Sequence, residues 1–153
     1  MPTFELTPMM MREIIMDHYS SPRHKADPIQ DGYVSVHAES TNCIDDFHVY
    51  LKEKDGVVED ALWNGVACTI STASTDILCD QVIGKSFKES KYMIKQFLNM
   101  IEEKEYDESV LDEAIVFINT GKQAARIHCA TMGWTAMKDL MEDKQDGRHQ
   151  VLG

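Results

Sequence analysis

The chain has 153 residues, of which 43% are hydrophobic and 27% charged, and it carries a formal net charge of -11 with a sequence pI near 4.8. A chain of this length buries roughly two-thirds of its unfolded surface without needing a disulfide, so we expect one globular domain over residues 1–153. The acidic balance argues against nucleic acid as a partner, because nucleic-acid affinity depends on a basic patch that releases counterions.

No segment is typical of a signal peptide or a membrane span. The N-terminal residues MPTFELTPMMMREIIMDHY lack a positive start followed by an uninterrupted apolar run, and no window of about 18 apolar residues occurs. We therefore expect a cytoplasmic protein that does not bind a membrane and whose thiols stay reduced. Its four cysteines, Cys43, Cys68, Cys79 and Cys129, are then metal ligands, nucleophiles or core residues rather than disulfide partners.

The first half of the chain predicts a helix followed by a meander of strands. Residues 8–19 place apolar side chains at helical spacing, with Thr7 as the N-cap and Pro8 at the first helical position. The strands expected from period-two alternation are 33–38, 47–53 and 57–64. Asp55 and Gly56 are typical of a hairpin turn, so an antiparallel arrangement is expected.

The second half predicts helices. The expected helices are 70–83, 87–101, 109–119 and a last helix from Lys122. The polar tail, residues 144–153, is expected to be frayed. This order of elements predicts an α+β fold, in which a small antiparallel three-stranded sheet packs against several helices.

Three of the four cysteines lie at junctions between predicted elements. Cys43 precedes a strand, Cys68 lies where the third strand gives way to a helix, and Cys129 lies near the start of the last helix. Side chains from distant segments can converge at such junctions, and a helix N-terminus favours the thiolate form. Asp45, two residues after Cys43, could add a carboxylate to a tetrahedral zinc site. Spacing alone leaves a shared metal site open, because no CxxC pair occurs and single cysteines are commonly buried as small hydrophobes.

Four motifs in this order carry a family resemblance. They are IIMDHYSSPRHK (14–25), NCIDD (42–46), GVACTISTAS (65–74) and ARIHCATMGW (125–134). Over nearly its whole length the chain resembles the SufU branch of the IscU/NifU N-terminal-type iron–sulfur cluster assembly proteins. The stretch from Cys68 to Cys129 is also similar to that branch, whose members carry an insertion that shorter IscU scaffolds lack.

The resemblance implies a zinc ion held by Cys43, Asp45, Cys68 and Cys129. It also implies that Cys43 accepts persulfide sulfur from a pyridoxal-phosphate-dependent cysteine desulfurase of the SufS type. The sulfur would then pass to downstream iron–sulfur assembly proteins or apo-proteins, which is a sulfurtransferase-like activity. Arg126 matches a family arginine, and from its helix face near Cys129 it could hold Asp45 through a carboxylate pair.

Departures from the family pattern keep two alternatives open. His128, next to Cys129, resembles a ligand of IscU scaffolds, so it is a further candidate metal ligand and favours a scaffold that holds a transient [2Fe–2S] cluster. Ile44 stands where the family usually has glycine, and isoleucine cannot cheaply adopt a positive φ. In the other alternative, changes such as Ile44 leave a structural zinc site without activity.

The remaining candidates are expected to serve the fold. Cys79 matches no family cysteine and lies in the apolar segment DILCDQVI, so we expect it in the core. His18 and His24 belong to the N-terminal family segment, and we expect them to order the fold or to contact the partner protein.

Overall fold

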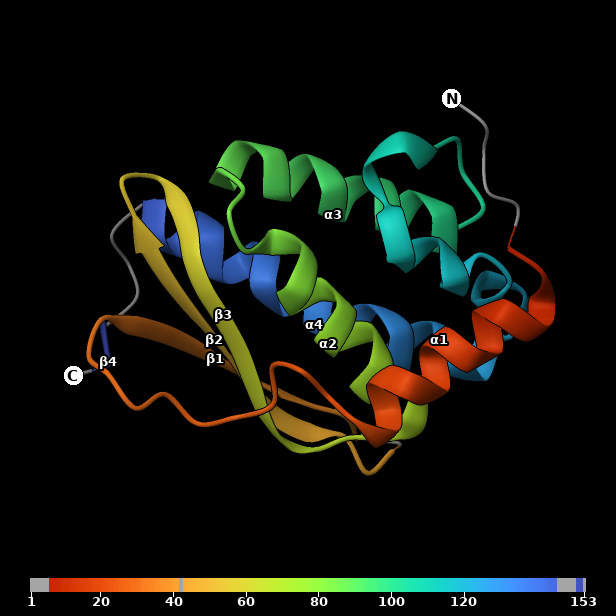
Figure 1. Ribbon diagram of the computed structural model, residues 1–153, viewed down its shortest axis with the longest axis horizontal. Coiled ribbons are helices and arrows are strands. Elements are labelled where there is room, and N and C mark those ends of the chain that lie inside the picture. The colour runs from red at the N-terminus through yellow and green to blue at the C-terminus, as the bar shows by residue number, and fades with distance from the viewer. Residues whose placement is uncertain (1–5, 42, 146–150, 153) are drawn as a thin grey trace.

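The computed structural model describes residues 6–41, 43–145 and 151–152, which form an antiparallel sheet with helices packed against it (Figure 1). The strands are β1 (Tyr33–Glu39), β2 (Asp46–Lys54), β3 (Val57–Val66) and β4 (Val151–Leu152), in the spatial order β3-β2-β1-β4. All of these pairs are antiparallel. The predicted α+β class and its three-stranded antiparallel meander are therefore confirmed.

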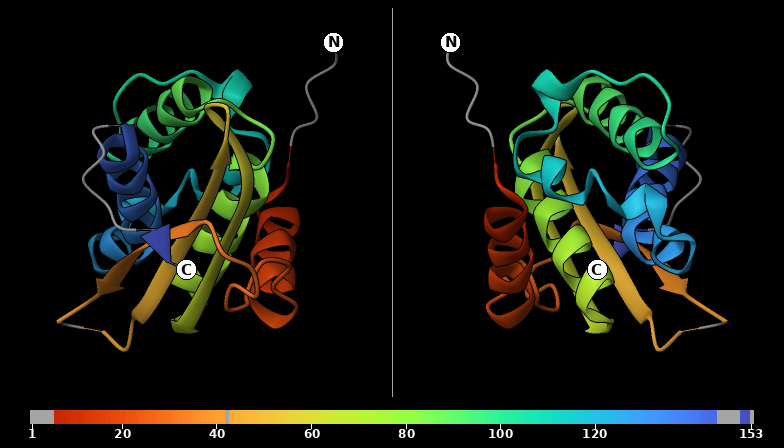
Figure 2. Two further views of the ribbon diagram at one scale, coloured as in Figure 1. Left: turned by 90° about the vertical axis from the view of Figure 1, so that its left-hand side faces the viewer. Right: turned by 90° about the vertical axis from the view of Figure 1, so that its right-hand side faces the viewer.

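The helices lie on one side of the curved sheet (Figure 2). They are α1 (Pro8–Ser20), α2 (Thr69–Val82), α3 (Phe87–Ile101) and α4 (Ala124–Gln145), with the short 3-10 helices η1 (Glu108–Val110), η2 (Asp112–Phe117) and η3 (Thr120–Lys122) between α3 and α4. Helix α2 packs against β3, α4 packs against β1 and β2, and α1 lies beside α2 (Figure 1). Among the described residues, no helix is long and apolar enough to cross a membrane.

Local signals explain most element boundaries. The Thr7 side chain accepts a hydrogen bond from the Met10 N–H, so it caps α1 as predicted. Asp55 and Gly56 both have positive φ, 55° and 78°, which matches the twist of the two-residue turn between β2 and β3. Helix α3 begins with a capping box at Ser86, and its bounds agree with the prediction.

One prediction from the sequence is corrected. The segment 109–119 is not one helix but a series of short 3-10 turns, because Asp112 adopts a positive φ of 46° that interrupts helical geometry. In the tail, residues 144 and 145 continue α4, and Val151–Leu152 pairs with Tyr33 and Val34 at the free edge of β1. Residues 146–150 and 153 lie outside the described residues.

Small residues let α2 and α4 approach closely. A Cβ added at Gly133 in α4 would lie 2.4 Å from Thr75 Oγ1 in α2, so no larger residue fits without movement. Ser74 Oγ donates to the Ala130 carbonyl at 2.6 Å and accepts from Trp134 Nε1 at 2.8 Å. These hydrogen bonds satisfy polar groups in a buried helix contact and fix the register of the two helices.

A buried carboxylate ties the N-terminal segment to α2 and β3. Asp76, fully buried in α2, accepts hydrogen bonds from the backbone N–H groups of Arg23 and His24 at 3.0 and 2.9 Å. It also pairs with His18 Nδ1 at 2.7 Å and accepts from Trp63 Nε1 at 3.2 Å. His18 contributes to this network through its ring and His24 through its backbone N–H, so both segments are tied to Asp76.

The His18–Asp76 pair predicts a specific dependence of stability on pH. Burial opposes the charged imidazole of His18, but hydrogen bonds with Asp76 and Glu113 outweigh it and raise its pKa. Burial likewise opposes the Asp76 charge, while its hydrogen bonds lower its pKa. The His18 contribution is complete below the unfolded pKa of about 6.5 and is lost as pH rises through the higher folded value; the Asp76 contribution is lost only in acid.

We therefore expect His18→Gln to lower the free energy of unfolding by about 3 kcal/mol near pH 6, and by less at about pH 9. Urea unfolding of both proteins at matched pH measures this difference. His24→Gln is the control, because the His24 ring pairs with the half-exposed Asp80 and its loss should change stability little. A His18 effect that is constant or grows with pH would contradict the assignment.

Candidate metal centre

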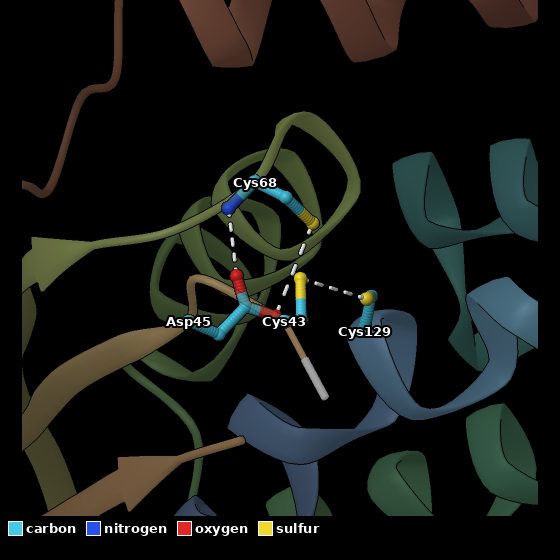
Figure 3. A group of neighbouring side chains, drawn as sticks. All are labelled: Cys43, Asp45, Cys68 and Cys129. Carbon is cyan, nitrogen blue, oxygen red and sulfur yellow. Dashed lines mark hydrogen bonds between the residues drawn. The ribbon is translucent and has the colours of Figure 1, made fainter. Parts of the chain in front are cut away.

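Four side chains from three separate segments point toward one another beside the N-terminus of α2 (Figure 3). Cys43 and Asp45 come from the loop between β1 and β2, Cys68 immediately precedes α2, and Cys129 lies in the second turn of α4. One ligand atom from each lies within 4.8 Å of all the others. The Cys43 and Cys129 sulfurs are 4.0 Å apart, and Cys68 Sγ lies 3.9 Å from Asp45 Oδ2.

Asp45 is almost completely buried, with 1% of its surface exposed. Its Oδ1 accepts the Cys68 backbone N–H at 2.7 Å, and its Oδ2 accepts the Ser71 hydroxyl at 2.5 Å. Burial of a carboxylate is costly unless hydrogen bonds or a cation compensate for lost water. The two hydrogen bonds fix the orientation of Asp45 and join the loop to the first turn of α2.

Cys68 is the N-cap of α2. Its sulfur accepts the Ser71 backbone N–H at 3.5 Å, and its backbone is extended, as an N-cap requires. The positive end of the helix dipole favours negative charge at this position. The Cys68 sulfur thus lies at the positive end of the α2 dipole.

The Cys129 thiol is buried beside the thiols of Cys43 and Cys68 and the carboxylate of Asp45. Burial, together with the neighbouring Cys68 thiol and the Asp45 carboxylate, raises the pKa of the Cys129 thiol to about 12. Several groups that become anionic are therefore crowded together without a positively charged side chain bonded to them among the described residues. A bound cation would relieve this repulsion.

The donor set fits a zinc ion. Zinc binds cysteine sulfur at about 2.3 Å and carboxylate oxygen at about 2.0–2.2 Å, so tetrahedral ligand atoms lie about 3.4–3.8 Å apart. The separations of 3.9 and 4.0 Å are close to this range. The three thiols and one carboxylate could hold zinc with only small side-chain movement, and thiolate ligands also suit iron–sulfur clusters.

The Cys43 loop does not require glycine at residue 44. Among the described residues, the non-glycine residues with positive φ are Asp55, Glu103 and Asp112. Ile44 is therefore accommodated with negative φ, and the Ser40 N–H donates to the Asp45 carbonyl at 2.9 Å across the loop. The isoleucine does not prevent Cys43 and Asp45 from reaching the same centre, and its side chain is 64% exposed.

The other sequence candidates lie outside this group. Arg126 and His128 are exposed at the start of α4, and His128 is not among the four residues that converge. The ion pairs of the described residues do not include one between Arg126 and Asp45. Cys79 is fully buried in the core, as predicted.

Ser71 is a residue that the sequence reasoning missed. Its hydroxyl contacts Asp45 and also lies 3.0 Å from the Cys129 carbonyl, while its backbone N–H donates to the sulfur of the N-cap Cys68. It thus touches three of the four converging residues without being a metal ligand itself. The sequence signal was a serine at the third helical position after Cys68, where an N-cap side chain finds its donor.

The fold and the site together define the class of protein. It is a small α+β protein whose helices cover one side of an antiparallel sheet, with a metal-binding group of three cysteines and one aspartate where loop and helix ends meet. The profile of the NifU-like N terminal domain family matches residues 10–146. Because this match covers most of the chain, the protein belongs to that family.

Individual relatives agree with this assignment. The chain is 32% identical over 139 residues to the zinc-dependent sulfurtransferase SufU of Bacillus subtilis, covering 90% of this chain and 93% of the relative. It is 28% identical over 134 residues to the iron–sulfur cluster assembly scaffold protein IscU of Thermotoga maritima, covering 88% and 94%. The crystal structure of FiSufU from Fervidobacterium islandicum AW-1 superposes with a TM-score of 0.78 at 28% identity, covering 83% and 93%.

Ser71→Ala is expected to weaken zinc binding about 10- to 100-fold, because it removes the hydroxyl that orients the Asp45 carboxylate. Competition with a chromophoric zinc chelator measures the affinity. Thr72→Ala is the matched control, since the Thr72 hydroxyl bonds the Ala67 carbonyl rather than Asp45. Equal zinc affinities for the two variants would exclude this role for Ser71.

Proposed function

We propose that this chain is an iron–sulfur cluster assembly protein that accepts persulfide sulfur at Cys43, in a centre where Cys43, Asp45, Cys68 and Cys129 hold zinc. The observation that carries the proposal is the difference in exposure among the three thiols. Cys43 is exposed, Cys68 is partly buried and Cys129 is buried. Cys43 is thus the most accessible of the three to a sulfur donor carried by another protein. The B. subtilis relative, which is named a zinc-dependent sulfurtransferase, supports the same activity.

The chemistry of transfer follows from this arrangement. Zinc, when bound, keeps coordinating cysteines deprotonated near neutral pH. The Cys43 sulfur forms a bond to the outer sulfur of a donor persulfide, the donor S–S bond breaks, and the donor thiolate leaves. Asp45 stays anchored by Cys68 N–H and Ser71 during this step, because those hydrogen bonds do not involve Cys43.

A cysteine desulfurase that uses pyridoxal phosphate is the proposed donor. Such a donor carries its persulfide on a protein cysteine, so its surface must meet the Cys43 loop. Two exposed apolar side chains favour such a contact: Ile44 follows Cys43, and Val66 lies opposite Asp46 at the end of β3, 58% exposed. Arg126 is proposed to assist catalysis from the exposed start of α4, by pairing with a carboxylate when the site rearranges.

A second candidate function is that of a scaffold for a [2Fe–2S] cluster, later transferred to apo-proteins. The T. maritima relative, named an assembly scaffold protein, supports it. Three sulfurs gathered within 4.8 Å of each other provide the thiolate ligands that such clusters use. The exposed His128 beside Cys129 is a further proposed ligand in this case.

Cys43→Ala is expected to abolish sulfur acceptance, because the buried Cys129 and the partly buried Cys68 cannot replace an exposed nucleophile. The protein is incubated with a SufS-type desulfurase and cysteine, and intact-mass spectrometry then detects an added sulfur atom. Thr41→Ala, an exposed change in the same loop, should leave acceptance unchanged. Sulfur loading of Cys43→Ala at the wild-type level would contradict the proposal.

Metal and sulfide content separates the two candidate functions. The sulfur-transfer proposal predicts about one zinc per chain and no acid-labile sulfide in anaerobically purified protein, since four ligands complete a tetrahedral zinc site. Plasma mass spectrometry and a sulfide assay measure both quantities. Iron and sulfide in equal amounts, with little zinc, would instead favour the scaffold.

A further inference from the structure

A second group of metal-binding side chains lies on the face of the sheet opposite the buried core. In the register of β1 and β2, His37 is directly opposite His48, and Glu39 is directly opposite Asp46. Side chains alternate along a strand, so these four share one face, while the intervening Phe47 points into the core. The face is exposed at this end of the sheet.

The imidazole of His37 lies between two carboxylates. Its Nε2 is 2.5 Å from Asp46 Oδ1 and 3.9 Å from Glu39 Oε2, and one ligand atom of each residue lies within 4.8 Å of the others. Like charges placed directly opposite each other in an antiparallel pair destabilise the sheet. Glu39 and Asp46 form such a pair in a chain whose net charge is -11, and the His37 imidazole between them is the group that offsets their repulsion when no ion is bound.

The His37 ring is held in place by its neighbour. The rings of His37 and His48 stack with centroids 4.6 Å apart and planes inclined by 14°, and His48 in turn stacks on Tyr50 at 6.0 Å. A ligand that is already oriented loses less conformational entropy when it binds an ion. The stack fixes the plane of the His37 ring, and the contact with Asp46 directs its Nε2 toward the carboxylates.

We propose that His37, Glu39 and Asp46 form a second metal site that binds a divalent first-row transition ion, with Zn²⁺ as its representative. One imidazole nitrogen and two carboxylate oxygens are ligands that zinc, nickel and cobalt accept. Water completes the coordination, because all three side chains are exposed. Ligand atoms around such an ion lie about 3.0–3.5 Å apart. The distances from His37 Nε2 to Asp46 Oδ1, 2.5 Å, and to Glu39 Oε2, 3.9 Å, lie on either side of this range.

The place of this site gives the bound ion a structural effect. Glu39 and Asp46 form the last pair of β1 and β2 before the loop that carries Cys43 and Asp45. An ion bound by both carboxylates would replace the repulsion between the two strand ends by a shared attraction. It would thereby fix the base of that loop. Asp45 and Asp46 are consecutive residues that point to opposite faces, so the loop has one metal-binding group on each side of the sheet.

The test titrates the purified protein, with its cysteine centre saturated by one zinc, with further Zn²⁺ in a calorimeter. We expect one additional ion per chain in the wild type. His37→Asn and Glu39→Gln should each weaken this second step at least about tenfold, because each removes one ligand. Both residues are exposed, so neither change should disturb folding.

His24→Asn is the matched control, because its ring also pairs with an aspartate, Asp80, but has one carboxylate partner rather than two. The proposal expects this variant to bind the second ion like the wild type. Absence of a second ion in the wild type, or equal loss in His24→Asn and His37→Asn, would overturn it. The outcome is independent of sulfur transfer, since no cysteine is altered.

Discussion

The close contact between α2 and α4 is the constraint on which the cysteine centre depends. Cys68 and Cys129 are far apart in sequence but lie within 4.8 Å of each other, and Gly133 leaves room for Thr75 where their helices cross. The serines of α2 hold this approach by bonding carbonyls of α4, and Ser71 extends the contact to Asp45. A single packed interface thus sets helix spacing and ligand spacing together, so that loss of packing at the crossing would separate the sulfurs.

Much of the fold could be predicted because local and periodic signals agree. The alternating strands around the Asp55–Gly56 turn and the capped, amphipathic α3 combine pattern with boundary signals, and both were found where expected. The segment after α3 has an apolar pattern without the backbone geometry of a helix, since Asp112 turns the chain. The pairing of β4 with β1 joins two segments that are far apart in the sequence, and such a long-range contact leaves no periodic signal in so short a strand.

The candidate centre could be predicted only in part. The three cysteines Cys43, Cys68 and Cys129 lie at element junctions, which favours their convergence, and the family motifs assigned Asp45 to them. The role of Ser71 depends on the distance between α2 and α4, which no residue pattern encodes. The pairing of Arg126 with Asp45 was inferred from helix periodicity, but periodicity fixes only the direction of a long side chain from its own helix, and the buried Asp45 already has other donors.

The burial of Cys129 links occupancy of the centre to the proton concentration around it. A thiol whose pKa is raised to about 12 keeps its proton at neutral pH, so an incoming cation must displace that proton before the sulfur can coordinate. Loading therefore acidifies the medium, and acid favours unloading. The proton that a cation must displace therefore lies on Cys129, the least accessible of the three thiols, whereas Cys43 is the exposed one.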